Sequence, residues 1–295
     1  MDKIIRCITS DGGIMAVCID ASDIVFTAKK LHRLSPVAAA ALGRLLCGAS
    51  MMGDMLKQKG ATLNLRINGG GPLGAVVAAA DSSGNVRGYV GNAKCPTEYY
   101  ENGKINVAAA VGKDGVLNVM RDYGEGEPYI GQVPLRSGEI AEDIAGYYAT
   151  SEQIPTVCSL GVLIDKADSE VLLAGGLLIQ LLPGADEETV SKLEKNANSL
   201  EPMTTMLAKG MSVLDICKKA LEGFEVEVLD ENKVNYVCTC SKNKLRAALE
   251  GLSARELEDI IEKDGKAEGI CYFCNKKYVF DKQELEDILK SNTKT

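Results

Sequence analysis

The sequence has no tryptophan, only four phenylalanines and a single histidine among its 295 residues. One histidine excludes metal centres built from several histidines. No segment approaches the roughly 20 consecutive apolar residues of a membrane span. No basic stretch followed by an apolar run marks the first residues as a signal peptide. We therefore expect a protein outside the membrane and place it in the cytoplasm.

Positive charge is also scarce, because 41 acidic residues outnumber 33 basic ones and the formal net charge is −8. Such a chain is repelled by nucleic-acid phosphates and by anionic membrane surfaces, so neither is expected as a main partner. The remaining composition, with 46% hydrophobic and 25% charged residues, is typical of globular proteins. The length allows a sizeable core and about two domains.

The start of the chain predicts a hairpin followed by a long helix. The segment "IIRCITSDGGIMAVCID" has two strand-like runs around the turn sequence Asp11-Gly12, which is typical of a hairpin. The segment "LSPVAAAALGRLLCGASMMGDMLK" predicts a helix with Ser35 as its N-cap and Pro36 at its first position. Its Ala- and Gly-rich sequence indicates a packed core helix.

Short β-rich runs follow, separated by turn sequences such as "NGGGP", "DSSGN" and "KDG". They include "INVAAAVGKDGVLNVMRD", and their pattern predicts adjacent antiparallel strands. A second helix is expected at about 138–151, before apolar strands in "TVCSLGVLID" and "VLLAGGLLIQLLPG". Because helices are segregated from mostly antiparallel strands, the predicted fold class is α+β, with residues 1–179 as the core domain.

Residues 180–232 differ from the core domain in composition, with eleven acidic residues against five lysines. Their pattern is amphipathic and helix-like, and it is broken at Pro202, Gly210 and Gly223. We interpret the segment as a helical linker. Two interpretations remain open: an acidic linker packed on the core, or an adaptable, methionine-bearing surface that another protein occupies.

Residues 233–295 form the last predicted unit. Ser241 can cap a first helix, and "SARE", from Ser253 to Glu256, is a capping box for a second. The segment "KDGKAEGICYFCNKKYVF" predicts a hairpin, and "DKQE" begins a final helix. The unit has too few apolar residues for independent stability, which favours an additional stabilising element.

Ten cysteines are the least ordinary feature of the composition. In a cytosolic chain of this length, clustered cysteines indicate metal or redox chemistry rather than a disulfide scaffold. Three of the isolated ones, Cys7, Cys18 and Cys158, lie in apolar strand-like runs, where we expect small, buried, inert thiols. The isolated cysteines are Cys7, Cys18, Cys47, Cys95, Cys158 and Cys217.

The other four cysteines form two close pairs, Cys238 and Cys240 in a C-x-C and Cys271 and Cys274 in a C-x-x-C. Four thiolates complete a tetrahedral zinc shell, and a C-x-x-C turn is typical of a zinc knuckle. The spacing therefore predicts one Zn²⁺ per chain. The metal is either permanent or held only until the thiols are oxidised, because each pair is close enough to join as a disulfide.

Two weaker signals are assigned to structure rather than to function. Gly69, Gly71 and Gly74 satisfy the G-x-G-x-x-G pattern of dinucleotide-binding folds. However, Pro72 interrupts the pattern, and a strand rather than a helix is predicted after it. The single histidine, His32, lies beside basic residues, and we expect a surface position for it rather than a catalytic one.

The paired cysteines and their flanks resemble the heat-shock protein 33 family, bacterial redox-regulated chaperone holdases. The similar segments span nearly the whole chain: "LSPVAAAALGRLLCGASMMG", "GPLGAVVAAAD", "GVLNVMRDYGEGEPYIGQVPL", "YVCTCSKNKLRAALEGL" and "GICYFCNKKYVF". The resemblance implies an ATP-independent chaperone that binds unfolded or partly unfolded client proteins. It also implies that residues 1–179 bind clients and dimerise, and that the active form is a homodimer.

The resemblance further implies how such a chaperone is controlled. The reduced, zinc-bound form would be inactive. Oxidation would form Cys238–Cys240 and Cys271–Cys274 disulfides, release zinc and unfold residues 233–295. The metastable linker, residues 180–232, would then loosen and expose a client-binding surface.

Two other classes of protein also use cysteine pairs or an α+β domain. A zinc-ribbon nucleic-acid module fused to an α+β domain is disfavoured by the acidic linker and the near-neutral last unit. An enzyme would be a thiol oxidoreductase that uses Cys271 and Cys274, or a hydrolase in the first domain. A thioredoxin-type C-x-x-C opens a helix after a strand, whereas this one is predicted in a hairpin. We therefore expect no enzyme and no catalytic residue.

Overall fold

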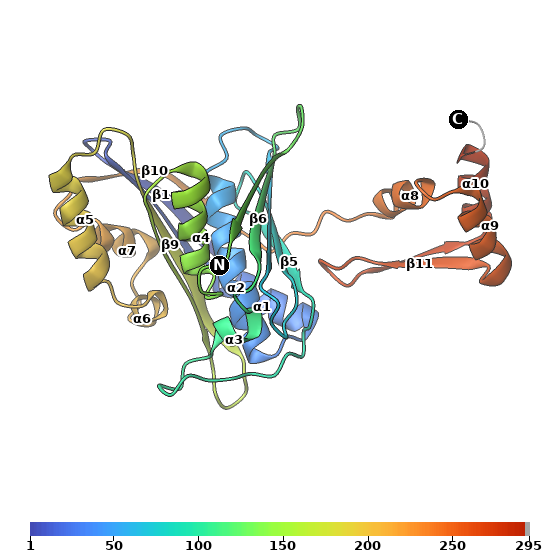
Figure 1. Ribbon diagram of the computed structural model, residues 1–295, viewed down its shortest axis with the longest axis horizontal. Helices are drawn as coiled ribbons and strands as arrows, with labels where there is room; N and C mark the ends of the chain where they lie inside the picture. Colours follow the sequence, from blue (N-terminus) through green and yellow to red (C-terminus); the bar gives the residue numbers. More distant parts are fainter. Residues whose placement is uncertain (293–295) are drawn as a thin grey trace. The chain divides into compact units, whose positions relative to one another are not determined.

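Two antiparallel sheets form the framework of the first part of the chain (Figure 1). The structure, a computed structural model, describes residues 1–292 and divides the chain into the units Met1–Val237 and Cys238–Thr295. In the first unit one sheet has the strand order β10-β1-β2-β9-β8, and the other has the order β5-β4-β3-β6-β7. Their strands are β1 (Lys3–Thr9), β2 (Ile14–Asp20), β3 (Thr62–Asn68), β4 (Val76–Asp81), β5 (Val86–Val90), β6 (Val116–Asp122), β7 (Tyr129–Pro134), β8 (Thr156–Ile164), β9 (Val171–Leu181) and β10 (Val226–Lys233).

Every neighbouring pair in these two sheets is antiparallel. The predicted hairpin at the start of the chain is confirmed, because β1 pairs with β2 across the predicted turn. The α+β fold class is therefore confirmed as well, with helices packed against mostly antiparallel strands.

The first unit has a layered core between its two sheets. α2 (Pro36–Asp54) packs between the sheets together with α1 (Ser22–His32) and α4 (Ala141–Tyr147), which a short π-helical turn, η1 (Tyr148–Glu152), extends (Figure 1). The large buried cluster between the sheets draws its side chains from all these elements and from β2, β3, β4 and β6.

The long central helix behaves as its sequence predicts. The Ser35 side chain accepts a hydrogen bond from the backbone N–H of Ala38 and so caps α2. α2 is also the single helix among residues 1–292 that is long and apolar enough, by length and composition alone, to cross a membrane. All its residues except Pro36 and Arg44 are buried, which identifies it as the core helix of this unit.

The helices of the predicted linker cover the opposite face of the first sheet. α5 (Glu187–Ser199), α6 (Met203–Ala208) and α7 (Val213–Ala220) pack on the sheet and, with it, form a second buried cluster, here called the linker cluster. Alternation along the strands explains the two clusters, because successive side chains point to opposite faces of a sheet. The buried members of the linker cluster are Ile5, Cys7, Ile14, Ala16, Cys18, Leu177 and Ile179 from the sheet, and Leu193, Met203, Met206, Leu207, Val213, Ile216, Cys217, Ala220 and Leu221 above it.

Three elements differ from the sequence prediction. The run "INVAAAV" was predicted as a strand, and this is wrong, because α3 (Val107–Val111) is a short helix. The Asn106 side chain starts that helix by accepting a hydrogen bond from Ala109 N–H, and Gly112 ends it at a φ of 78°. Neither α1 nor β10 was predicted. β10 is an acidic strand that exists because its backbone pairs with β1.

The glycine-rich turn at residues 69–74 connects β3 to β4, and a strand follows it as predicted. Its glycines allow two backbones to approach closely. A Cβ atom on Gly69 would lie 2.2 Å from the carbonyl oxygen of Gly112, and one on Gly71 would lie 2.4 Å from that of Ala110. The G-x-G-x-x-G pattern is thus a packing feature of the loop against the end of α3.

The second unit, described to residue 292, is small and mixed. It comprises α8 (Lys242–Glu250), α9 (Ala254–Lys263), β11 (Lys266–Ile270), β12 (Lys277–Asp281) and α10 (Lys282–Asn292). The predicted caps are confirmed, because Ser241 accepts a hydrogen bond from Lys244 N–H, and Ser253 and Glu256 form a reciprocal capping box. Its buried hydrophobic residues among those described are Leu257, Tyr278, Phe280, Leu285 and Ile288.

Candidate metal centre

The four paired cysteines converge at one place in the second unit. Cys238 and Cys240 lie just before α8, and Cys271 and Cys274 lie in the turn between β11 and β12. All four Sγ atoms are within 4.8 Å of one another. The short contacts join one pair to the other, at 3.7 Å between Cys238 and Cys271 and 3.3 Å between Cys240 and Cys274.

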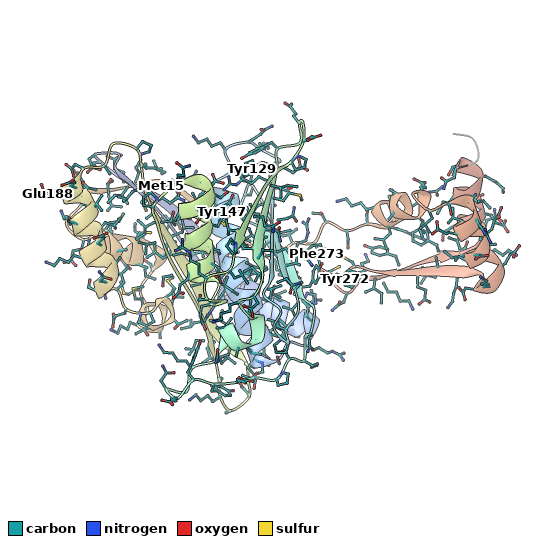
Figure 2. All side chains as sticks on the ribbon, viewed as in Figure 1. Met15, Tyr129, Tyr147, Glu188, Tyr272 and Phe273 are labelled. Atoms are coloured by element: carbon teal, nitrogen blue, oxygen red, sulfur yellow. The ribbon has the colours of Figure 1, made fainter. Side chains whose placement is uncertain are left out.

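The β11–β12 hairpin positions the C-x-x-C pair. Cys271 N–H donates to the carbonyl of Lys276, and Asn275 N–H donates to the carbonyl of Cys271 at 2.7 Å. Asn275 takes a positive φ of 55°, a conformation that asparagine tolerates better than most residues. Two aromatic residues, Tyr272 and Phe273, separate the two cysteines in this turn (Figure 2).

The spacing of the sulfurs fits a bound metal ion. Four sulfurs at about 2.3 Å from a central zinc ion lie about 3.8 Å from each other. The two short contacts, 3.7 Å and 3.3 Å, are close to that edge length, and they are far longer than the roughly 2.05 Å of a disulfide. All four cysteines are free thiols here. An all-sulfur donor set suits a soft or borderline ion, so these residues could hold a metal ion such as zinc.

The thiols of the centre differ in acidity. Burial opposes ionisation of Cys240, yet hydrogen bonds with Tyr278 and Cys274 lower the pKa of its thiol to about 7. Burial raises the pKa of Cys274 to about 12, and burial also raises the pKa of Cys238. Cys240 therefore ionises more readily near neutral pH than Cys238 or Cys274 does, and a thiolate is the form that binds metals and reacts with oxidants.

Tyr278 is a neighbour of the centre that the sequence analysis missed. Its Oη atom lies 3.1 Å from the Sγ of Cys240. The hydrogen bond to Cys240, together with burial, raises the pKa of Tyr278 to about 12. The phenol therefore stays protonated and can donate a hydrogen bond to the sulfur of Cys240. The alternation of β12 gave a signal, because Tyr278 and Phe280 share the buried face of "KYVFD".

The isolated thiols lie mostly where the sequence predicted. Cys7 and Cys18 have no accessible surface, which confirms that they are buried, whereas Cys158 is only partly buried. Burial nevertheless raises the pKa of Cys158 to about 12. His32 is the last residue of α1 and is partly buried, and its Nε2 lies 3.2 Å from the hydroxyl of Tyr236. The histidine thus has a structural hydrogen-bond partner.

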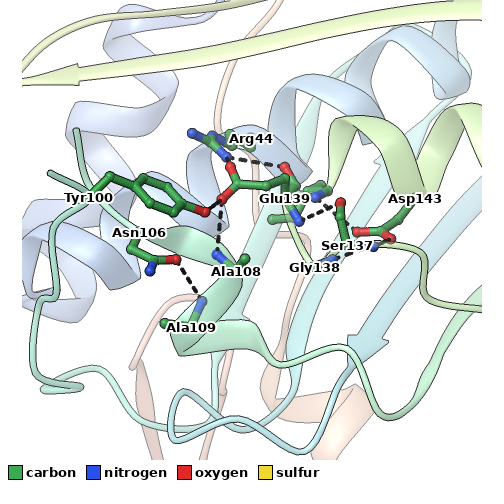
Figure 3. Close-up of polar contacts among 10 residues, drawn as sticks. Arg44, Tyr100, Asn106, Ala108, Ala109, Ser137, Gly138, Glu139 and Asp143 are labelled. Carbon is green, nitrogen blue, oxygen red and sulfur yellow. Dashed lines mark hydrogen bonds and ion pairs between the residues drawn. The ribbon is translucent and has the colours of Figure 1, made fainter. Parts of the chain in front are cut away.

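The first unit contains one extensive polar network, around the loop before α4 (Figure 3). Glu139 accepts hydrogen bonds from the hydroxyl of Tyr100 at 2.6 Å, from Ala108 N–H, and from the guanidinium of Arg44. Burial opposes ionisation of Glu139, but Tyr100 and Arg44 outweigh it and lower the pKa of this carboxyl. The carboxylate is fully engaged in joining this loop to α2 and α3, which is a structural role.

Asp143 completes this network in the first turn of α4. Its carboxylate accepts hydrogen bonds from the backbone N–H groups of Arg136, Ser137 and Ile140. The same contacts hold Ile140 at a φ of 73°, a strained conformation for a branched residue. The strain is thus accounted for by the capping of α4.

Fold and centre together define a two-unit α+β protein with four thiols near the end of the chain that could hold a metal ion. Comparison with known proteins agrees with this class. The family model described as "Hsp33 protein" matches residues 2–281. The chain is 47% identical to the 33 kDa chaperonin of Clostridioides difficile, over 98% of this chain and 99% of that protein.

Two further relatives extend the agreement to sequence and fold. The 33 kDa chaperonin of Bacillus subtilis is 40% identical over the full length of both chains. The crystal structure of the 33 kDa chaperonin (heat shock protein 33 homolog) of Thermotoga maritima superposes with a TM-score of 0.90, at 38% identity and 99% coverage of each chain. The chain therefore belongs to the Hsp33 family, and this membership supports a chaperone function.

Proposed function

We propose that this protein is a redox-regulated, ATP-independent holdase that binds unfolding proteins under oxidative stress and prevents their aggregation. The reduced, zinc-bound form is inactive and the oxidised form is active. One observation carries the regulatory part: four thiols converge within 4.8 Å in a unit with only a small buried core. Family membership supports the chaperone part.

Cys238, Cys240, Cys271 and Cys274 are the proposed ligands, with one Zn²⁺ per chain. When bound there, zinc would supply folding free energy to the second unit and keep the four sulfurs as thiolates. Tyr278 donates a hydrogen bond to Cys240 and thereby orients this ligand, as neighbours of metal ligands commonly do.

Oxidation of the C-x-C pair begins in this proposal at the sulfur of Cys240, which lies close to Cys274 and Tyr278. Hydrogen peroxide converts its sulfur to a sulfenic acid and one water leaves. The thiol of Cys238 then attacks that sulfur, so that a disulfide forms and a second water leaves. Cys271 and Cys274 form the second disulfide in the same way, and sulfurs joined in disulfides no longer bind a metal.

The proposed consequence is loss of structure in residues 233–295, followed by loosening of the linker, residues 180–232. The linker cluster indicates what would be uncovered. α5, α6 and α7 cover the apolar side chains of Ile5, Ile14 and Ile179 on the first sheet, which have at most 1% exposure. Apolar surface of this kind binds unfolding chains, and the net charge of −8 helps to keep the complexes soluble.

The remaining parts of the proposal concern assembly and class. The active form is a homodimer in the cytoplasm, and residues 1–179 bind clients and dimerise, as the family resemblance implies. Nucleic acid and membranes are not partners. Cys271 and Cys274 lie in a hairpin turn rather than at the start of a helix, which argues against a thioredoxin-type oxidoreductase.

The decisive assay is light scattering of a heat-unfolding client protein, with no nucleotide present. We expect the oxidised protein to suppress aggregation and the reduced, zinc-bound protein to leave it unchanged. Cys95→Ser, which alters a buried thiol of the first unit, is the matched control and should switch normally. Equal suppression by both forms would remove the switch, and no suppression by either form would remove the chaperone.

A further inference from the structure

A second group of cysteines lies in the linker cluster of the first unit. Cys7 is in β1, Cys18 is in β2 and Cys217 is in α7, and none of them has accessible surface. Cys217 packs in the same buried cluster as Cys7 and Cys18, and its thiol interacts with both of theirs. Two thiols thus belong to the sheet, and the third belongs to the linker helix that packs on it.

The backbone explains why these three thiols meet. In the β1–β2 pairing Cys7 lies opposite Ala16, and Cys18 lies opposite Ile5. Residues two apart on a strand point to the same face, so Cys7 and Cys18 are diagonal neighbours on one face of the sheet. α7 packs on both strands, and Cys217 lies on its buried side with Ile216.

We propose that Cys217 forms a disulfide with one of the two strand thiols, Cys7 or Cys18, and that this bond locks α7 onto the sheet. Hydrogen peroxide is the oxidant. One thiol becomes a sulfenic acid with loss of water, and the second thiol attacks that sulfur with loss of another water. Two thiols and one peroxide therefore give one disulfide and two waters. Either pairing has the same consequence, because both strand thiols belong to the sheet.

Burial decides when the lock can form. Interaction with the Cys217 thiol, together with burial, raises the pKa of Cys7. Interaction with the Cys18 thiol, together with burial, raises the pKa of Cys217. Thiolate is therefore scarce while α7 is docked, and oxidant reaches these sulfurs only when the helix opens locally. The lock forms more slowly than the disulfides of the four-thiol centre.

Only the consequence of the lock rests on the proposed function. If α5, α6 and α7 cover the client-binding surface, a bond between α7 and the sheet keeps that surface covered. The chain then carries two sets of cysteines whose oxidation has opposite effects on the linker. Oxidation of the four-thiol centre opens the linker, and oxidation at Cys217 closes it.

The test uses full-length, zinc-loaded protein treated with hydrogen peroxide just below its unfolding temperature. The sample is then denatured in an alkylating agent, and its disulfides are mapped by mass spectrometry. We expect peptides that link Cys217 to Cys7 or to Cys18. We also expect residues 180–225 to be cleaved by protease at least about tenfold more slowly than in Cys217→Ser protein oxidised in the same way.

The variants distinguish the lock from general oxidation. Cys217→Ser and the double variant Cys7→Ser/Cys18→Ser should lose both effects, whereas each single strand variant should keep them. Cys95→Ser, a buried cysteine whose Sγ lies 3.6 Å from the carbonyl oxygen of Pro96, is the control and should behave like the parent protein. Cys217→Ala replaces Cys217→Ser if the buried hydroxyl prevents folding.

Two results would overturn the lock. One is the absence of any disulfide that contains Cys217. The other is such a disulfide with no slowing of linker cleavage. The client assay separates the lock from the proposed function. If the parent protein forms the lock but oxidised Cys217→Ser protein, which cannot form it, never suppresses aggregation, the function alone is refuted. A holdase without a Cys217 disulfide refutes the lock alone.

Discussion

The two units of the chain differ most in how much apolar surface they bury. Met1–Val237 has one large cluster between its sheets and a second beneath α5, α6 and α7. In the described part of the second unit the buried hydrophobic residues are five. A unit of roughly 60 residues with so small a core gains only a few kcal/mol from it. We therefore expect the second unit to depend on the proposed metal centre and the first unit to fold without it.

The thiols of the two units also differ, in their exposure and in their acidity. Both units bring cysteines together, but the four of the second unit are partly exposed, whereas Cys7, Cys18 and Cys217 are fully buried. In the second unit, hydrogen bonding lowers the pKa of Cys240. In the first unit, the pKa values of the buried thiols Cys7 and Cys217 are raised. Proximity allows a disulfide, and accessibility decides which one forms first.

The largest expected effect comes from removing two ligands of the proposed centre. The variant Cys271→Ser/Cys274→Ser should lose its zinc, and with it folding free energy on the order of 10 kcal/mol. Limited trypsin digestion should then degrade residues 238–292, cleave the loosened linker, and leave a resistant fragment that contains β1 to β9. Cys158→Ser is the control and should keep its zinc. Full zinc retention in the double variant would refute the assignment of ligands.

Mild peroxide at ambient temperature should separate the two groups of thiols. The partly exposed sulfurs of the four-thiol centre should react early, while Cys7, Cys18 and Cys158 stay reduced. Burial raises the pKa of Cys158 to about 12, so only about one in 100,000 of its thiols is ionised at neutral pH. Mass mapping of modified thiols decides this. Modification led by Cys7, Cys18 and Cys158 would contradict their burial.

Equivalent core truncations should have different consequences in the two units. Leu285, in the second unit, and Leu63, in β3 of the first unit, are both fully buried. Each Leu→Ala substitution should cost about 2–5 kcal/mol. Leu285→Ala should speed zinc release to a chelating dye, whereas Leu63→Ala should lower the thermal transition of the first unit and leave zinc release unchanged. Equal zinc release rates in both variants would contradict the dependence of the metal site on the small core.

The smallest expected effect concerns the hydroxyl of Tyr278. Tyr278→Phe removes the hydrogen bond to Cys240 and keeps the ring in the core. We expect zinc affinity to fall by about 10- to 100-fold, the usual cost of losing a partner of a metal ligand. Competition with a chelator measures the change, and Tyr99→Phe in the first unit is the control. An unchanged affinity would show that this hydroxyl does not support the ligand.

Local signals in the sequence predicted most of the fold. The caps at Ser35, Ser241 and Ser253 depend only on residues three positions away, so each could be read directly from the chain. β10 could not, because an acidic strand is stabilised only by pairing with β1. α3 was misread because its alanines and valines suit a short strand as well as a helix, and the Asn106 cap decided between them.

Part of the candidate site could likewise be predicted from local sequence, and part could not. The spacing of the two cysteine pairs predicted that four thiols would gather, and their convergence needs only a hairpin and the start of a helix. Which sulfurs approach each other across the pairs, and the contact with Tyr278, depend on tertiary packing. The same holds for the thiols of the linker cluster, which come from three elements that only the folded chain brings together.

Amide hydrogen exchange of the full-length protein, before and after oxidation, tests the central claim most directly. The account predicts that oxidation with loss of zinc abolishes protection in residues 238–292, weakens it in α5, α6 and α7, and preserves it in α2 and in β3 to β6. Protection retained throughout residues 238–292 after complete oxidation and zinc loss would contradict the claim that the four thiols hold this unit folded.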